Sequence, residues 1–239
     1  MSSTPFDILA IAAHRDDVEQ TCGGTLLKAA QRGQRTGILD LTQGEMGTRG
    51  TAEDRAREAA DAAKILGVAW RRALDIPDGR VENTWENRLK VVRILREQRP
   101  RVLILPYWEG RHPDHYTAAT LGYEAAFLSG LAKLPARGSA HRPFKIIYAS
   151  LYRDVRPTFV VDITEQFETR FESLMAYKSQ FTDQDVGSGI FPAQKEIRAR
   201  VESIARYYGM LGGVTYAEPF VQKEVGLVDD VTTVPVKSI

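Results

Sequence analysis

ILAIAAHRDDVE, residues 8–19, is the stretch of sequence that decides how this chain folds. Its first half is a short apolar run, which is typical of a buried strand. Its second half places one imidazole, from His14, and two carboxylates, from Asp16 and Asp17, directly after that strand. The stretch therefore predicts a strand that ends in a polar site at one edge of a sheet.

A second cluster of the same kind lies about a hundred residues further on. The apolar run 102–105 is followed by His112-Pro113-Asp114-His115, and the two clusters together hold three of the four histidines. In open α/β sheets, ligands bind beyond the carboxyl ends of the strands, at the point where the strand order reverses. If the strand order is 3-2-1-4, the first and fourth strands are neighbours there, and the two clusters meet.

The rest of the chain alternates short apolar runs with amphipathic segments of helical length. This pattern indicates an α/β fold, a Rossmann-like and mostly parallel sheet sandwiched by helices, in a single domain over residues 1–226 with a C-terminal tail over 227–239. Thr51 and Asp54 form a predicted capping box. Strands are expected near 7–12, 36–42, 72–76, 102–106, 146–151 and 158–163, and helices near 25–31, 52–66, 85–98, 115–129, 164–181 and 193–208, with exposed loops at 43–50 and 182–192.

Composition excludes several classes of protein. The chain has 239 residues, 43% of them hydrophobic, enough for a sizeable core, and its 32 Lys and Arg nearly balance 31 Asp and Glu. We therefore expect no nucleic-acid partner. No apolar run approaches the roughly 18 residues of a membrane span, and residues 1–5 lack the positive charge of a secretory signal. With the single Cys22, these features favour a cytoplasmic protein that has no membrane partner.

The two clusters have the composition of a catalytic metal site. A catalytic zinc has three protein ligands and one open position for water. We assign His14, Asp17 and His115 as the metal ligands, which leaves Asp16 and His112 to transfer protons. The expected reaction is hydrolysis of an amide.

Several other residues in or near the two clusters have expected roles of their own. We expect the carboxylate of Asp114 to accept a hydrogen bond from a ring N–H of His112 and so to fix its tautomer. By itself the pair of adjacent aspartates is more often a solvated turn or a helix cap. Cys22 is expected to be a small buried thiol and not a nucleophile, and His141 a surface residue.

The two motifs together resemble the LmbE-like (PIG-L) family of zinc-dependent N-acetylglucosaminide deacetylases. Further segments resemble the bacillithiol-biosynthesis branch, whose members remove the acetyl group from N-acetyl-α-D-glucosaminyl L-malate; these segments are GEMGTRGT (44–51), IPDG (76–79), RHPDH (111–115), YKSQF (177–181) and YAEPF (216–220). The resemblance implies zinc, with Fe²⁺ as an alternative, a small N-acetylated amino-sugar substrate and a homo-oligomer, often a hexamer.

Carried over by position, the resemblance implies the same site residues: His14, Asp17 and His115 as metal ligands, Asp16 as general base, and His112 with Asp114 as the assisting pair. It adds three substrate-binding arginines, Arg55 in the helix after the glycine-rich loop and Arg111 and Arg142 at the rim of the pocket. A malate group carries two carboxylates, which suit the planar fork of arginine.

The sequence departs from the family pattern at two places. Arg15 stands where the family commonly has proline, which places a cation beside the metal; it is expected either to point to solvent or, if it points inward, to change substrate preference or the acidity of Asp16. Some relatives also place a tyrosine of the C-terminal loop near the metal, whereas residues 187–197 contain none.

Two other classes of protein compete with this interpretation. One is a nucleotide-binding oxidoreductase, although the first turn reads CGG at 22–24 and not G-x-G-x-x-G. The other is a non-catalytic sugar-binding relative, suggested by Arg15.

Overall fold

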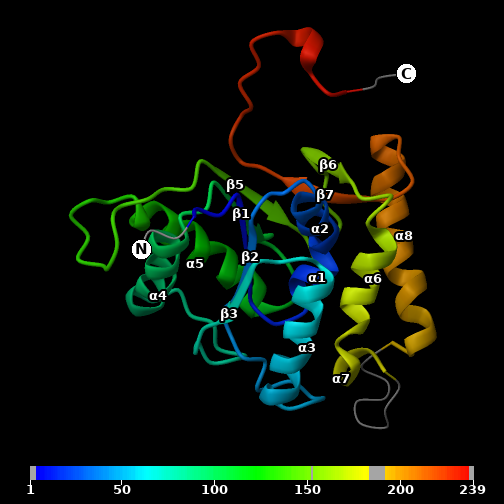
Figure 1. Ribbon diagram of the computed structural model, residues 1–239, viewed down its shortest axis with the longest axis horizontal. Coiled ribbons are helices and arrows are strands. Elements are labelled where there is room, and N and C mark those ends of the chain that lie inside the picture. The colour runs from blue at the N-terminus through cyan, green and yellow to red at the C-terminus, as the bar shows by residue number, and fades with distance from the viewer. Residues whose placement is uncertain (1–3, 152, 183–191, 237–239) are drawn as a thin grey trace.

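A computed structural model describes residues 4–151, 153–182 and 192–236. Its centre is a seven-stranded sheet in the order β3-β2-β1-β4-β5-β7-β6 (Figure 1). The strands are β1 (Ile8–Ala12), β2 (Thr36–Asp40), β3 (Trp70–Ala73), β4 (Val102–Pro106), β5 (Lys145–Ala149), β6 (Phe159–Asp162) and β7 (Ala217–Val221).

The strand order predicted for the first four strands is confirmed. β1 pairs in parallel with β2 on one side and with β4 on the other, so that Ile8 lies opposite both Thr36 and Val102. Because β1 to β5 run parallel, their carboxyl ends share one edge of the sheet. The loops that carry the two polar clusters leave this edge side by side.

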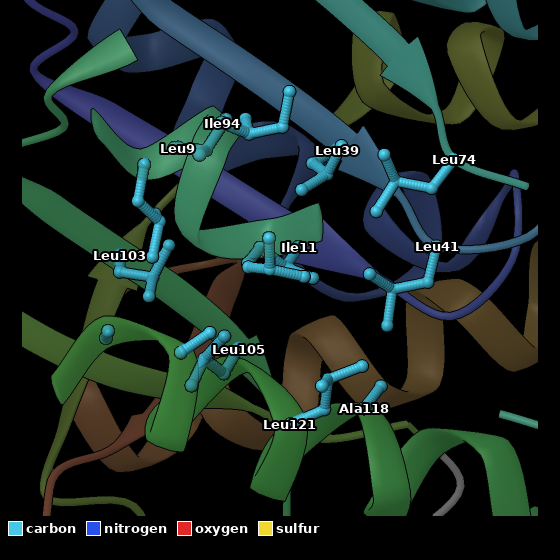
Figure 2. Packing of buried hydrophobic residues seen from close by; sticks show 14 of the residues in the cluster. Leu9, Ile11, Leu39, Leu41, Leu74, Ile94, Leu103, Leu105, Ala118 and Leu121 are labelled. Atoms are coloured by element: carbon cyan, nitrogen blue, oxygen red, sulfur yellow. The ribbon is translucent and has the colours of Figure 1, made fainter. Parts of the chain in front are cut away.

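Helices cover both faces of the sheet, as the sequence predicts. On one face, α4 (Trp85–Gln98) and α5 (Pro113–Ser129) pack against alternate strand residues such as Leu9, Ile11 and Leu103 (Figure 2). The opposite face packs against α1 (Asp17–Thr21) and α2 (Gly23–Gln31). The remaining helices are α3 (Ala52–Ile65), α6 (Phe167–Met175), α7 (Lys178–Phe181) and α8 (Gln194–Gly212).

The predicted helix boundaries agree best with the structure where a capping residue marks the start of the helix. α4 spans the predicted residues, and α3 begins at a capping box in which Thr51 and Asp54 bond reciprocally. The single helix expected over 164–181 is instead two helices, α6 and α7, separated at Ala176 and Tyr177. The loop expected at 182–192 falls largely on 183–191, which lie outside the described residues.

Two elements were not predicted. The five-residue α1 begins inside the HRDD motif itself. β7 lies between β5 and β6, antiparallel to both, although its sequence AEPFV contains a proline and a glutamate. Both residue types are depleted in strands, and a proline normally argues against an internal strand.

The end of the chain leaves the body of the molecule. From Lys223 to Val236 every residue is exposed, and the only regular element in this described stretch is a short 3₁₀ turn, η1 (Val231–Thr233). Figure 1 shows this segment as an arm that extends away from β7. Among the helices of the described ranges, none is long and apolar enough to cross a membrane.

Candidate metal centre and active site

The two polar clusters meet at the carboxyl edge of the sheet. His14 follows β1, Asp17 begins α1, and His115 lies in the first turn of α5. The ring nitrogens His14 Nδ1 and His115 Nε2 are 3.2 Å apart. The Asp17 carboxylate completes the triangle, with Oδ1 3.3 Å from His115 Nε2 and Oδ2 3.7 Å from His14 Nδ1.

These spacings fit three ligands of one small cation. Ligands about 2.0–2.1 Å from a tetrahedral ion lie about 3.3 Å from each other. Two imidazole nitrogens and a carboxylate are also the donor types that zinc accepts. The ring of His112 lies close by, since its nitrogen is within 4.8 Å of those of His14 and His115. These residues could therefore hold a divalent metal.

The opposite nitrogen of His14 faces two carboxylates. His14 Nε2 lies 3.0 Å from Asp78 Oδ1 and 3.3 Å from Asp114 Oδ2. A metal-binding histidine characteristically donates its second N–H to such a carboxylate, which fixes the ring and its tautomer. From the sequence, Asp78 was identified only as part of the IPDG segment (76–79), so its contact with His14 was missed.

Asp114 has a different partner from the one predicted. Its carboxylate accepts hydrogen bonds from the backbone N–H groups of Gly79, at 2.8 Å, and Val81, at 3.1 Å, in addition to its contact with His14. No bond joins this carboxylate to the ring of His112 among the described residues. The prediction of that bond is wrong because Asp114, buried in the first turn of α5, points toward the 77–81 turn.

The backbone, and not a carboxylate, orients His112. His112 is the N-cap of α5, and its Nδ1 accepts a hydrogen bond from the backbone N–H of Asp114 at 3.2 Å. Burial and the neighbouring His14 and His115 lower the pKa of His112, which favours the neutral ring. With Nδ1 acting as the acceptor, the neutral ring carries its proton on Nε2.

The charges around His14 favour a cation. Burial by itself lowers the pKa of His14, but hydrogen bonds to Asp114, Asp17 and Asp78 outweigh it and raise that pKa to about 12. Burial likewise disfavours the Asp17 carboxylate, yet His115 and His14 hold its pKa well below the usual range. The site thus stabilises positive charge at the position where the ligand atoms converge.

Asp16 stands beside this centre in an unusual conformation. Its φ of 115° lies in the left-handed region, which is costly for a residue other than glycine and is characteristic of functional sites. Burial raises the pKa of Asp16 to about 7, while the guanidinium of Arg55, 3.1 Å from Oδ1, acts to lower it. A carboxylate with a pKa near 7 suits a general base.

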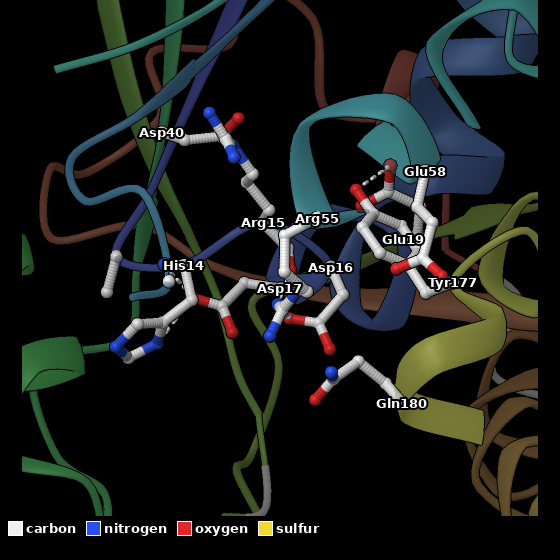
Figure 3. Close-up of polar contacts among 12 residues, drawn as sticks. His14, Arg15, Asp16, Asp17, Glu19, Asp40, Arg55, Glu58, Tyr177 and Gln180 are labelled. Carbon is white, nitrogen blue, oxygen red and sulfur yellow. Dashed lines mark hydrogen bonds and ion pairs between the residues drawn. The ribbon is translucent and has the colours of Figure 1, made fainter. Parts of the chain in front are cut away.

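Arg55 is held by the protein and is almost fully buried. Its side chain, 5% exposed, donates to the backbone carbonyl of Arg15 and to Asp16, and its guanidinium lies over the ring of Tyr177 (Figure 3). The structure thus places Arg55 against the predicted base. Its predicted contact with substrate stays a prediction.

Arg15 points neither to solvent nor to the metal. Its guanidinium donates to the carbonyl oxygens of Gln43, at 3.2 Å, and Ala52, at 2.7 Å, and the residue is buried. These bonds connect the HRDD turn to both ends of the glycine-rich loop. The expectation that Arg15 points to solvent is therefore wrong, and an effect of the inward Arg15 on substrate preference or on Asp16 stays a prediction.

The other two predicted arginines lie in different places. Arg111 lines a wide cleft of about 520 Å³ with Trp108, Glu109, Tyr116 and Arg153. Arg142 instead precedes β5, at the amino edge of the sheet, and packs on the ring of Phe127 near the far end of α5. Pro113 and Phe127 are 14 positions apart in α5, which corresponds to a rise of about 20 Å along the helix. Arg142 is therefore not at the rim of this site within one chain.

The chain is similar in sequence to known deacetylases. A family model described as PIG-L, GlcNAc-PI de-N-acetylase, matches residues 9–126. The diacetylchitobiose deacetylase of Thermococcus kodakarensis is 33% identical over 224 residues, which cover 88% of this chain and 80% of that protein.

Solved structures share the fold over nearly the whole chain. The conserved protein TT1542 from Thermus thermophilus is 40% identical, with a TM-score of 0.85 and coverage of 94% of this chain and 98% of that one. The N,N'-diacetylchitobiose deacetylase from Pyrococcus horikoshii is 26% identical, with a TM-score of 0.78 and coverage of 89% and 82%. The family model matches a stretch that includes both polar clusters and the strands between them. The chain belongs to the PIG-L (LmbE-like) family of deacetylases, enzymes that hydrolyse N-acetyl amides.

Proposed function

We propose that the protein is a metal-dependent hydrolase that removes the acetyl group from an N-acetylglucosaminide, with N-acetyl-α-D-glucosaminyl L-malate of bacillithiol biosynthesis as its substrate. Water adds to the amide carbonyl, the C–N bond breaks, and the products are acetate and the free amine. The observation that carries the proposal is the triangle of His14, Asp17 and His115 beside the buried Asp16.

The cofactor proposed is a single divalent metal held by His14, Asp17 and His115. Zinc fits the donor set, and Fe²⁺ accepts the same ligands. A divalent ion at this position supplies Lewis acidity, which lowers the pKa of a water from about 15.7 to near 7 and polarises the amide carbonyl.

The protein supplies the proton transfers. Asp16 is placed to accept the proton of the attacking water, and Arg55 holds its carboxylate in position. Asp16, which then carries that proton, or His112 in its protonated form delivers a proton to the departing amine as the C–N bond breaks. Asp114 and Asp78 act through His14, whose ring they orient.

The wide cleft beside the metal centre supports a substrate that carries carboxylates. Two of its lining residues are arginines, Arg111 and Arg153, and Arg153 also pairs with Glu109 at 3.2 Å. A guanidinium binds carboxylates bidentately, so a malate group is well matched to this cleft. The further expectations, a cytoplasmic location and a homo-oligomer, possibly a hexamer, remain part of the proposal.

A substrate panel tests the proposal. Purified protein loaded with zinc or Fe²⁺ is assayed for free amine on N-acetylglucosaminides with and without a carboxylate in the aglycone. We expect the malate compound to be hydrolysed fastest, and Arg111→Ala to raise KM for that compound more than for N-acetylglucosamine. Equal rates across the panel would remove the malate assignment and leave the deacetylase.

Two alternatives have distinct outcomes. A deacetylase for another N-acetylglucosamine-containing substrate is favoured by the 33% identity to a diacetylchitobiose deacetylase. It predicts that chitobiose-type substrates outperform the malate compound. A non-catalytic sugar-binding relative would bind these sugars and release no amine with any metal.

A further inference from the structure

A small cavity opens directly beside the metal centre, between the carboxyl ends of β1, β4 and β5. Asp17 and His115 stand at its rim, together with Tyr107, Glu109 and Gly110 of the loop after β4. The last two also line the wide cleft, so cavity and cleft adjoin. A group that enters from the cleft reaches the cavity past the predicted metal ligands.

The floor of this cavity is apolar. It is formed by side chains from four elements and the segment after β5: Ile11, Ala12, Val18, Cys22, Ile104, Ala149 and Leu151. Most of them belong to the core cluster on the α1–α2 face of the sheet. The cavity is thus the end of this core that side chains leave unfilled.

The polar atoms near the floor already have partners. Thr21 donates its hydroxyl proton to the carbonyl oxygen of Asp17 at 2.8 Å and contacts the sulfur of Cys22. Burial raises the pKa of the Cys22 thiol, so it remains a neutral apolar group. The Thr21 hydroxyl proton is therefore already engaged, and the mostly apolar floor favours a hydrocarbon group.

The cavity is also small. The volume available to the centre of a water-sized sphere is about 20 Å³. On the same measure, a cavity that holds one water molecule needs about 10–15 Å³. One methyl group fits this space, and a chain of two or more carbons meets the buried side chains of Ile104 and Ala149.

We propose that this cavity binds the methyl group of the substrate's acetyl and excludes longer acyl chains, with Ile104, Ala149 and Leu151 as the residues that set the limit. The inference rests on the proposed function and adds the acyl specificity, which the metal centre alone does not determine. One extra methylene in an apolar pocket changes specificity by about 10-fold or more. N-acetyl substrates are therefore expected to exceed N-propionyl ones by at least that factor.

Two matched substitutions test this limit by activity. Ile104→Val removes one methyl from the floor, and Ile147→Val removes the same group from the neighbouring strand on the same face, outside the cavity. We expect Ile104→Val to raise the propionyl-to-acetyl ratio of kcat/KM several-fold and Ile147→Val to leave it unchanged. The same ratio in both variants would overturn the proposal.

A filling substitution tests it in the opposite direction. Ala149→Val adds two methyls to the wall, and we expect it to lose N-acetyl hydrolysis while it retains N-formyl hydrolysis. Equal losses on both substrates would contradict the proposal.

Binding of the acid product separates this inference from the proposed reaction. Formate, acetate, propionate and butyrate are titrated into zinc-loaded protein, and saturation transfer to their C–H protons is measured by NMR. We expect acetate to bind more tightly than butyrate, and Ala149→Val to weaken acetate and spare formate. This pattern without any amine release would reject the proposed hydrolysis and keep the pocket; amine release with no such pattern would reject the pocket alone.

Discussion

Asp16, the proposed general base, combines a left-handed backbone, burial and an arginine partner within one residue. Asp16→Asn keeps the shape and removes the proton-accepting carboxylate. We expect kcat to fall about 10²- to 10⁴-fold, the usual contribution of a general base. Zinc content, measured by elemental analysis of the purified variant, should be unchanged, because Asp17 and not Asp16 completes the ligand triangle. The exposed Asp61→Asn is the control, and a loss below tenfold would reject the assignment.

Arg55 determines the pH at which this base is active. Because the cation lowers the pKa of Asp16, its removal raises that pKa, and the ionised base is then lost at a higher pH. In Arg55→Met the acidic limb of the kcat/KM profile should move to higher pH by about 1 unit or more. A bound metal acts on both proteins alike, so the difference between their profiles carries the prediction. Arg55→Lys keeps the charge and should move the limb less; a limb that moves to lower pH would contradict the role.

For single residues, the sequence predicts which chemical groups meet in the site better than it predicts the contacts that each side chain makes. The convergence of His14, Asp17 and His115 was predicted because strand ends determine where these residues lie; their role as metal ligands stays a proposal. Asp78 was missed because a Pro-Asp-Gly turn gives no indication of which histidine it faces. Arg142 was placed wrongly because position at an edge of the sheet depends on whether a residue precedes or follows its strand.

Contacts with neighbouring segments hold the glycine-rich loop (residues 43–50) in place. Arg15 bonds to carbonyls at both of its ends, and Glu45 accepts a hydrogen bond from the backbone N–H of Asp78. Arg15→Ala leaves two carbonyls without their charged donor, at a cost of about 2 kcal/mol in unfolding free energy. We expect faster amide hydrogen exchange over residues 43–52 and unchanged exchange in α4. The exposed Arg32→Ala is the control, and unchanged exchange over 43–52 would show that Arg15 does not hold the loop.

β7 is held in the sheet by Glu218. Its buried carboxylate pairs with Arg170 at 3.2 Å. The same carboxylate accepts hydrogen bonds from the backbone N–H groups of Gly24 and Thr25 at the start of α2. A Cβ on Gly24 would lie 3.0 Å from Glu218 Oε1, so only glycine allows this approach without displacement. Glu218→Ala leaves the buried guanidinium of Arg170 with its backbone carbonyl acceptors but without a carboxylate, and should lower the unfolding free energy by about 3 kcal/mol. Urea denaturation measures the loss, and the exposed Glu224→Ala should show none.

The same residue explains what the sequence could not predict about the elements. Hydrophobic periodicity located β1, β2, β4 to β6 and the long helices. It placed the third strand at 72–76, whereas β3 spans Trp70–Ala73, because the two arginines of WRRA interrupt the apolar run. β7 has Glu218 and Pro219 at its centre, and its place depends on partners about 190 positions away. No local pattern contains that information.

The whole molecule exposes an apolar arm that its own body does not cover. Between Val225 and Val236 six large apolar side chains are exposed, among them Val225 at 97%, Leu227 at 94% and Val231 at 82%. The root of the arm is fixed, because the ammonium of Lys223 lies 4.6–5.0 Å from the ring centres of Trp108, Tyr123 and Tyr148. The arm thus leaves the body from a defined position.

A second copy of this chain is the partner that would cover the arm, and the exposed α8 residues Ile204, Tyr207, Met210 and Leu211 offer an apolar surface for it. Single exposed apolar residues are common, but a contiguous set of this kind marks an interaction site.

We expect the full chain to be a homo-oligomer by light scattering, and a chain that ends at residue 225 to have a smaller mass. Its melting temperature at high concentration should fall only through lost association, because the arm contributes no residue to the cores. Leu227→Asp with Val231→Asp should reproduce the loss of mass at full length, whereas Asp229→Asn should not. A full-length monomer, or an unchanged mass after truncation, would show that the arm is not the interface.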